Sequence, residues 1–277
     1  ENENKESVDC GKEISGDISG IKVLGAGCKS CHEQYENAKK AVKSLGLSVE
    51  VEYITDMEKV MEYGVMSMPA IVVNEKVVSM GKVFVFVNQK GGVGKTTSCI
   101  NIGAYIAMAG KKVLLVDFDS QGNMSSGTGV SKDKPTIYEL LSGESQPEET
   151  VKHTMIKNLD AISASIDLSG AAIELVDQEK REFFLREALE PLQSKYDYIL
   201  IDCPPSLGIL TLNGLAAADA VLVPMQCEYF ALEGITLLLH TVKKVQKSLN
   251  PYFVIGGIFF ILYDSSIRLA LDVVLLV

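Results

Sequence analysis

A glycine-rich segment containing two lysines stands between an apolar stretch, residues 83–87, and a stretch with helical periodicity. It reads Lys90-Gly91-Gly92-Val93-Gly94-Lys95-Thr96-Thr97. Glycines let backbone N–H groups turn inward around phosphate oxygens, and the positive end of the following helix favours an anion. We therefore predict a phosphate-binding loop in which Lys95 reaches the β- and γ-phosphates of a nucleotide and Thr96 ligates Mg²⁺.

The loop departs from the general phosphate-loop pattern at one position, because Gln89 stands where that pattern has its first glycine. A glycine-rich turn without any ligand is the plain alternative, but it does not explain the order of glycines, lysine and threonine. Since Lys95 already supplies positive charge to the phosphates, Lys90 needs a second role.

Carboxylates follow two of the predicted strands. Asp117 and Asp119 stand at the end of a strand over residues 113–118, and Asp202 ends an apolar strand over 198–201. Open α/β sheets bind ligands beyond the carboxyl ends of their strands. An aspartate at this place usually holds Mg²⁺ through water, so we expect that role for Asp202. The plain alternatives are a solvated pair that caps a strand and an ordinary strand end.

These motifs resemble the ParA/Soj branch of the deviant Walker ATPases, and the resemblance covers residues 82–277. It implies a chromosome or plasmid partitioning ATPase, a switch that binds Mg²⁺ and ATP and forms an ATP-dependent homodimer. It further implies that Lys90 reaches the ATP of the other subunit, that Asp119 orients the attacking water, and that Asp117 supports Mg²⁺ and the loop. A ParB-like activator and non-specific DNA are the implied partners. Relatives continue with a further strand and helices, so we expect a C-terminally truncated domain.

A pair of cysteines, Cys28 and Cys31, opens a predicted helix near the start of the chain. A helix N-terminus stabilises thiolate, and the short spacer lets the sulfurs meet. Residues 21–81 resemble the small thioredoxin-like redox proteins, with Pro69 in the place of their cis-proline. The resemblance implies Cys28 as nucleophile and Cys31 as resolving thiol, and a missing last helix. A metal site with His32 and Cys10 is the alternative, although zinc would favour a second close pair.

Strand and helix periodicities alternate along the chain and predict an α/β protein of two domains. We expect a polar tail over 1–20, a thioredoxin-like domain over 21–81 and a P-loop ATPase domain over 82–277, whose mostly parallel sheet is covered by helices on both faces. The expected strands are 21–24, 49–54, 70–73, 77–80, 83–87, 113–118, 198–201, 220–224 and 253–262. The expected helices are one that follows the cysteine-containing turn and runs through residue 43, and those over 57–63, 96–109, 179–193 and 234–249.

Composition limits the classes of function. The 277 residues carry a formal net charge of −10, so a DNA-binding face would have to concentrate its cations against the overall field. No secretory signal is recognisable, and the most apolar stretch, residues 252–263, is shorter than the roughly 20 residues of a membrane-spanning helix. We expect a cytoplasmic protein that does not enter a membrane.

Two other functions stay open beside the partition-type ATPase. One is a thiol-disulfide oxidoreductase whose nucleotide-binding region is incidental or regulatory. The other is a scaffold that binds ATP but barely hydrolyses it. The two domains join without a linker at Lys82, which suggests a chimeric or truncated reading frame, and we expect no coupling between redox state and ATP turnover.

Overall fold

The computed structural model describes residues 18–25, 27, 29–63, 70–77, 82–251, 253–264, 266 and 268. The chain divides into two compact units, Glu1–Met80 and Gly81–Val277. Among the described residues, no helix is both long and apolar enough to cross a bilayer.

The smaller unit contains a four-stranded sheet in the order β2-β1-β3-β4. Strands β1 and β2 are parallel, while β3 is antiparallel to both β1 and β4. The strands are β1 (Ile21–Leu24), β2 (Val51–Ile54), β3 (Ala70–Val73) and β4 (Lys76–Val77), and the helices are α1 (Lys29–Ser44) and α2 (Met57–Glu62). This order of elements agrees with the predicted thioredoxin-like fold.

Each face of the small sheet packs against one helix. Val23 lies in a cluster that includes Tyr35 and Ala38 of α1, and Leu24 lies in a second cluster that includes Val60 of α2. The alternation of adjacent residues between the faces is the period of two that a strand imposes.

The predicted hairpin between β3 and β4 is present. Asn74 and Glu75 both have positive φ, 49° and 63°, as a two-residue turn of type I′ requires. The predicted end of the second strand, over 78–80, lies outside the described residues, and so does Pro69.

The larger unit contains a seven-stranded sheet in the order β11-β10-β5-β9-β6-β8-β7. All neighbouring strands are parallel except β7, which runs antiparallel to β8, so the predicted mostly parallel sheet is confirmed. The strands are β5 (Lys82–Phe86), β6 (Val113–Asp117), β7 (Val151–His153), β8 (Leu159–Ile162), β9 (Tyr198–Asp202), β10 (Ala220–Gln226) and β11 (Val254–Ile261).

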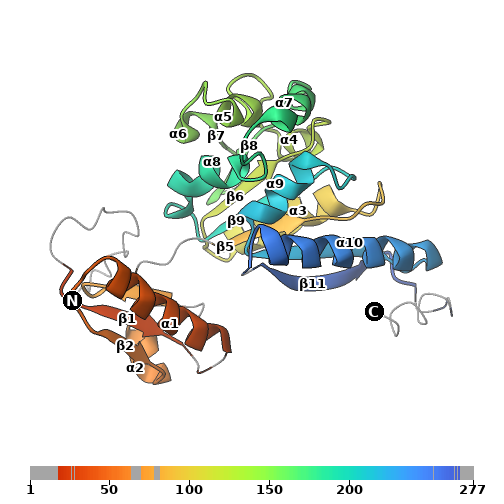
Figure 1. The fold of residues 1–277 in the computed structure, drawn as a ribbon. Coiled ribbons are helices and arrows are strands. Elements are labelled where there is room, and N and C mark those ends of the chain that lie inside the picture. The colour runs from red at the N-terminus through yellow and green to blue at the C-terminus, as the bar shows by residue number, and fades with distance from the viewer. Residues whose placement is uncertain are drawn as a thin grey trace, which may run out of the picture. The chain divides into compact units, whose positions relative to one another are not determined.

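Helices cover both faces of this sheet (Figure 1). Leu114 and Val116 of β6 pack into a cluster with residues of α8, α9 and α10, whereas Val113 and Leu115 pack with residues of α3 and α4 on the opposite face. The helices are α3 (Lys95–Met108), α4 (Asn123–Thr128), α5 (Ile137–Leu141), α6 (Pro147–Thr150), α7 (Leu168–Glu174), α8 (Phe184–Gln193), α9 (Ile209–Ala217) and α10 (Tyr229–Ser248), with a 3₁₀ turn η1 (Leu175–Asp177).

Two predicted helices begin in the wrong place, and the one expected over 234–249 already starts at Tyr229. The helix expected over 179–193 starts at Phe184, because the residues before it form turns and Lys180 has a φ of 54°, in the left-handed region that a right-handed helix does not contain. Strands β7 and β8 and helices α4 to α7 and α9 were not predicted. Helix α9 is buried on almost every side and therefore lacks the amphipathic period that marks a surface helix.

Candidate functional site

The glycine-rich loop leads from the end of β5 into the first turn of α3. Gly92 and Gly94 have φ values of 74° and 67°, which glycine adopts at little cost. Val93 between them is fully buried and anchors the loop, while Gly91 and Gly92 are exposed. Gly94 is the N-cap of α3 and offers no side chain to cap it, so the first N–H groups of the helix are available to an anion.

Side chains at both ends of the loop hold its backbone. Asn88 donates from Nδ2 to the carbonyl oxygen of Pro224 at 2.8 Å, and its Oδ1 accepts from the backbone N–H of Lys90 at 3.0 Å. Lys95 donates from Nζ to the carbonyl oxygen of Lys90 at 3.2 Å. The backbone of Lys90 is therefore held from both sides, and sequence reasoning had assigned no part in this to Asn88.

Sheet register brings two of the predicted carboxylates together. Phe86 is paired with Asp202 on β9, and Asp202 is paired with Asp117 on β6, so the three residues form one row at the carboxyl ends of adjacent strands. The loop leaves β5 immediately beyond this row. The structure thus places Asp117 and Asp202 beside the predicted phosphate-binding loop.

Asp202 is a buried carboxylate whose two oxygens accept no hydrogen bond from any residue that the structure describes. Its exposed fraction is 1%. Burial raises the pKa of Asp202 to about 7, against smaller opposing effects of Thr96 and Lys95. Thr96 is near enough to lower this pKa, although the two groups do not reach full hydrogen-bond geometry. A buried polar group without a partner is costly, and a cation at this place would remove the cost.

Asp117 is also fully buried, but its carboxylate is hydrogen-bonded. Oδ2 accepts from the backbone N–H of Ser125 at 2.8 Å and from the Ser125 hydroxyl at 2.6 Å. Burial raises the pKa of Asp117, and the bonds from Ser125 oppose this rise. Ser125 in turn accepts at Oγ from the backbone N–H of Ala164 at 3.0 Å, just beyond β8. Ser125 lies in the short helix α4, and no period in the sequence indicates its contact with Asp117.

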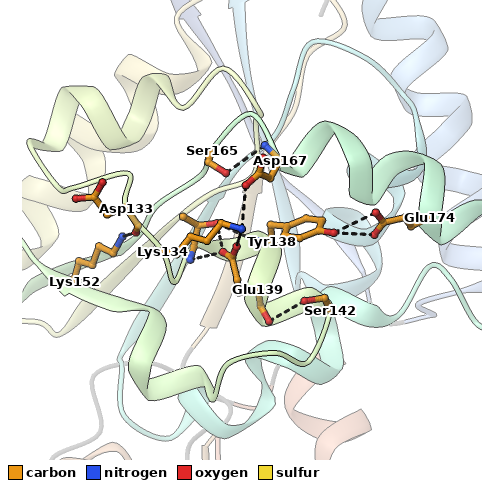
Figure 2. A network of polar contacts seen from close by, with 10 residues as sticks. Asp133, Lys134, Tyr138, Glu139, Ser142, Lys152, Ser165, Asp167 and Glu174 are labelled. Atoms are coloured by element: carbon orange, nitrogen blue, oxygen red, sulfur yellow. Dashed lines mark hydrogen bonds and ion pairs between the residues drawn. The ribbon is translucent and has the colours of Figure 1, made fainter.

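Polar contacts hold the segment around Ala164 in place. Ser163 accepts at its carbonyl oxygen from the N–H of Ile137, and at its hydroxyl from Nζ of Lys152 at 2.8 Å. Figure 2 shows the network beside it, in which Lys134 lies between Glu139 and Asp167. These contacts fix the part of the chain from which Ala164 supports Ser125.

Glu139 is the buried member of this network. Burial acts to raise its pKa, but the ion pair with Lys134 and hydrogen bonds from Thr136 outweigh burial and lower the pKa to about 2. The Thr136 N–H and hydroxyl donate to Glu139 Oε2 at 2.8 and 2.7 Å. This capping box fixes the start of α5.

Lys95 has an exposed fraction of only 7%. Burial lowers its pKa, and the charges of Asp202 and Asp119 act in the opposite direction. A buried lysine, a buried carboxylate and N–H groups at a helix start therefore lie at one edge of the sheet. Together they fit a phosphate group and a divalent cation.

The donor set fits Mg²⁺ better than a metal held by protein alone. Among the described residues, no three His, Cys, Asp or Glu side chains are grouped to hold a metal ion. Mg²⁺ commonly binds through one or two carboxylates, waters and substrate phosphates. Thr96, Asp117 and Asp202 are the side chains that would hold it, partly through water.

Asp119 lies shortly beyond the end of β6 and is half-buried. Its Oδ1 accepts from the N–H of Gln121 at 3.0 Å, and its carbonyl oxygen accepts from the N–H of Gly122 at 2.9 Å. These bonds form a tight turn that fixes Asp119 close to Asp117.

Lys90 lies against the end of β10. Its Nζ forms an ion pair with Glu228 and donates to Oε1 of Gln226 at 3.2 Å. The Nε2 of Gln226 donates in turn to the carbonyl oxygen of Gly92 at 3.5 Å. The second lysine of the loop is therefore held within its own subunit, by partners that sequence reasoning did not identify.

Of the two cysteines predicted to react, the structure describes Cys31. It lies in the first turn of α1 and is fully buried. A Cβ added to Gly25 would lie 2.6 Å from Cβ and 2.8 Å from Sγ of Cys31, so glycine is required beyond the end of β1. Cys28 and Cys10 lie outside the described residues, and the alternative metal site lies there with them.

Comparison with known proteins gives matches to both units. A family model for an AAA domain matches residues 81–255, and a thioredoxin-domain model matches residues 19–85. The chromosome-partitioning ATPase Soj of Treponema pallidum (strain Nichols) is 63% identical over 195 residues, which are 70% of this chain and 77% of that protein.

Solved structures also match the larger part of the chain. A plasmid partition protein from Borrelia burgdorferi is 31% identical with a TM-score of 0.64, covering 72% of this chain and 85% of that one. Cobyrinic acid a,c-diamide synthase from Mycobacterium smegmatis, with bound ADP and magnesium, is 42% identical with a TM-score of 0.68. The latter match covers 71% of this chain and 80% of that one.

Proposed function

The chain belongs to the ParA/Soj family of chromosome-partitioning ATPases, and from this membership we propose that its larger unit is a switch that binds Mg²⁺ and ATP and dimerises with ATP bound. The observation that carries the proposal is the buried carboxylate of Asp202, which has no hydrogen-bond partner among the described residues and stands in register with Asp117. Mg²⁺ and the phosphates of ATP would supply the partners that this edge of the sheet lacks.

Each side chain of the site has a task in this proposal. The N–H groups of the loop and Lys95 bind the β- and γ-phosphates, Thr96 ligates Mg²⁺, and Asp202 holds it through water. Bound Mg²⁺ would neutralise charge on the transferring phosphoryl group. Asp117 supports the cation site and is itself kept in place by Ser125.

Hydrolysis requires two further side chains in this proposal. Asp119 orients the attacking water. Lys90 crosses the dimer and places positive charge where the phosphoryl group of the partner's ATP becomes more negative, as an arginine finger does. A scaffold that binds ATP without hydrolysing it would need Lys95 but neither Asp119 nor Lys90, which separates the two functions.

The experiment is to measure ATP binding, dimerisation and hydrolysis on the whole chain with Mg²⁺. The proposal predicts that dimer formation depends on ATP and that the turnover per subunit rises with protein concentration. Turnover that is independent of protein concentration would contradict a dimerising switch. A ParB-like activator and non-specific DNA are the partners to add next, as expected of a cytoplasmic partition protein.

A second activity is proposed for the smaller unit, that of a thiol-disulfide oxidoreductase. Cys31 lies in the first turn of α1, where it is fully buried and close to Gly25. This position suits a resolving thiol that is protected from solvent. Cys28 would be the nucleophile, activated by the helix N-terminus. Thiol-disulfide exchange by the whole chain, compared with Cys31→Ser, tests this activity independently of ATP turnover.

A further inference from the structure

Lys90 is paired within its own subunit, although the proposed function requires it to act on the ATP of the other subunit. Lys90 Nζ forms an ion pair with Glu228 and a hydrogen bond with Gln226, both at the junction of β10 and α10. The side chains of Lys90 and Glu228 remain 41% and 52% exposed. Water and salt therefore reach the contact, and a moderate competing interaction is enough to replace it.

The backbone around Lys90 is held more firmly than its side chain. Asn88 accepts from the N–H of Lys90 at 3.0 Å, and Lys95 donates to its carbonyl oxygen at 3.2 Å. Gln226 links the lysine to the loop, because it also donates to Gly92. A change in the direction of Lys90 therefore needs only rotation of its own side chain, with no movement of the loop.

We infer that Glu228, assisted by Gln226, is a positioning residue that holds Lys90 inside its own subunit and so competes with the reach of Lys90 to the ATP of the partner. The inference rests on the proposed function, in which Lys90 acts across the dimer. In this inference, the ammonium group has to leave Glu228 of its own chain before it can reach the partner's phosphate. The subunit with Lys90 released is then the form competent to dimerise, and its population sets the apparent affinity of the dimer.

An exposed ion pair reduces the released population only moderately. Removing it is expected to raise the apparent association constant by about two- to fivefold. The substitution to use is Glu228→Gln, which keeps the size of the side chain and removes its charge, with Glu228→Ala as a second variant. Glu148→Gln is a matched control, because Glu148 pairs with Lys195 at 2.6 Å and is likewise 52% exposed.

The test is the association constant of the full chain with Mg²⁺ and AMPPNP, measured by sedimentation, together with the rate of ATP turnover. Each Glu variant is measured with Lys90 present and in a Lys90→Ala background. We expect Glu228→Gln to strengthen association only where Lys90 is present. Added salt should reduce the difference, because it screens the ion pair, and Glu148→Gln should change association in neither background.

Three results would overturn the inference. The first is that Glu228→Gln leaves the association constant unchanged, and the second is that it changes the constant equally with and without Lys90. The third is that Glu228→Gln weakens association only when Lys90 is present, which would mean that Glu228 assists Lys90 in the dimer. Failure of the proposed function looks different. If Lys90→Ala alone leaves dimer-dependent turnover intact, Lys90 has no role across the dimer, and the inference falls with it.

Discussion

Replacing Asp202 by asparagine is predicted to stabilise the protein in the absence of nucleotide while weakening its binding of Mg²⁺ and ATP. Burial raises the pKa of Asp202 to about 7, from an ordinary value of 3.8. Between these two values the folded chain keeps a proton that the unfolded chain has released. The free energy of unfolding therefore falls as the pH rises through this window, by about 4 kcal/mol at most.

The variant Asp202→Asn has no carboxylate to ionise, so it avoids this loss. Below about pH 4 it should be as stable as the parent protein, and its advantage should grow with pH and level off above about pH 7 at about 2 to 4 kcal/mol. Urea unfolding of the whole chain at several pH values, without nucleotide or Mg²⁺, gives the difference. Calorimetry at about pH 8 should show binding of Mg²⁺ and ATP weakened by about 10- to 100-fold.

Asp117→Asn is the matched comparison, because Asp117 lies in the same row but is hydrogen-bonded to Ser125. It should stabilise the protein less than Asp202→Asn does at high pH, because burial also raises the pKa of Asp117 but the hydrogen bonds from Ser125 oppose that rise. If Asp202→Asn destabilises the protein at high pH, or changes its stability equally at every pH, burial does not penalise the charge of Asp202.

Four further substitutions test the roles of single side chains. Lys95→Ala should weaken ATP binding by about 10- to 100-fold in calorimetry, because it removes the charge that faces the phosphates. Lys90→Ala should leave the affinity for ATP unchanged in calorimetry and lower ATP turnover by about 10³-fold. Asp119→Ala should bind ATP without hydrolysing it and accumulate as a dimer in light scattering, and a monomeric variant that still hydrolyses ATP would contradict its role. Glu139→Gln should lower the free energy of unfolding at neutral pH by about 1 to 3 kcal/mol in urea titrations. This loss should shrink as the pH falls from about 4.5 towards about 2, because the carboxylate of the parent protein then also becomes protonated.

Local chemistry made the conformation of the glycine-rich loop predictable from sequence. The strand before it is apolar, Gly92 and Gly94 permit the positive φ values that the turn needs, and Lys95 opens the helix. The same reasoning located the hairpin at Asn74, because this turn chemistry depends on adjacent residues. Such features need no knowledge of distant parts of the chain.

Contacts between distant segments were not predictable in the same way. The row of Phe86, Asp202 and Asp117 depends on the order of strands in the sheet, which no single segment determines. The ion pair of Lys90 with Glu228 depends on that order too, whereas Ser125 supports Asp117 from only eight residues further along the chain. Neither pairing leaves a period or motif in the sequence.

The most direct test of the central claim mixes two variants that are each expected to be inactive. In a mixed dimer of Lys90→Ala and Asp119→Ala subunits, the first subunit keeps its own Asp119 and receives Lys90 from the second, so one complete site forms. Equal amounts should recover activity that neither variant has alone, and about a quarter of the parent rate if the subunits pair at random, because half of the dimers are then mixed and each has one working site. A mixture no more active than its two components would contradict the account, since Lys90 would then act only on the ATP of its own subunit or not at all.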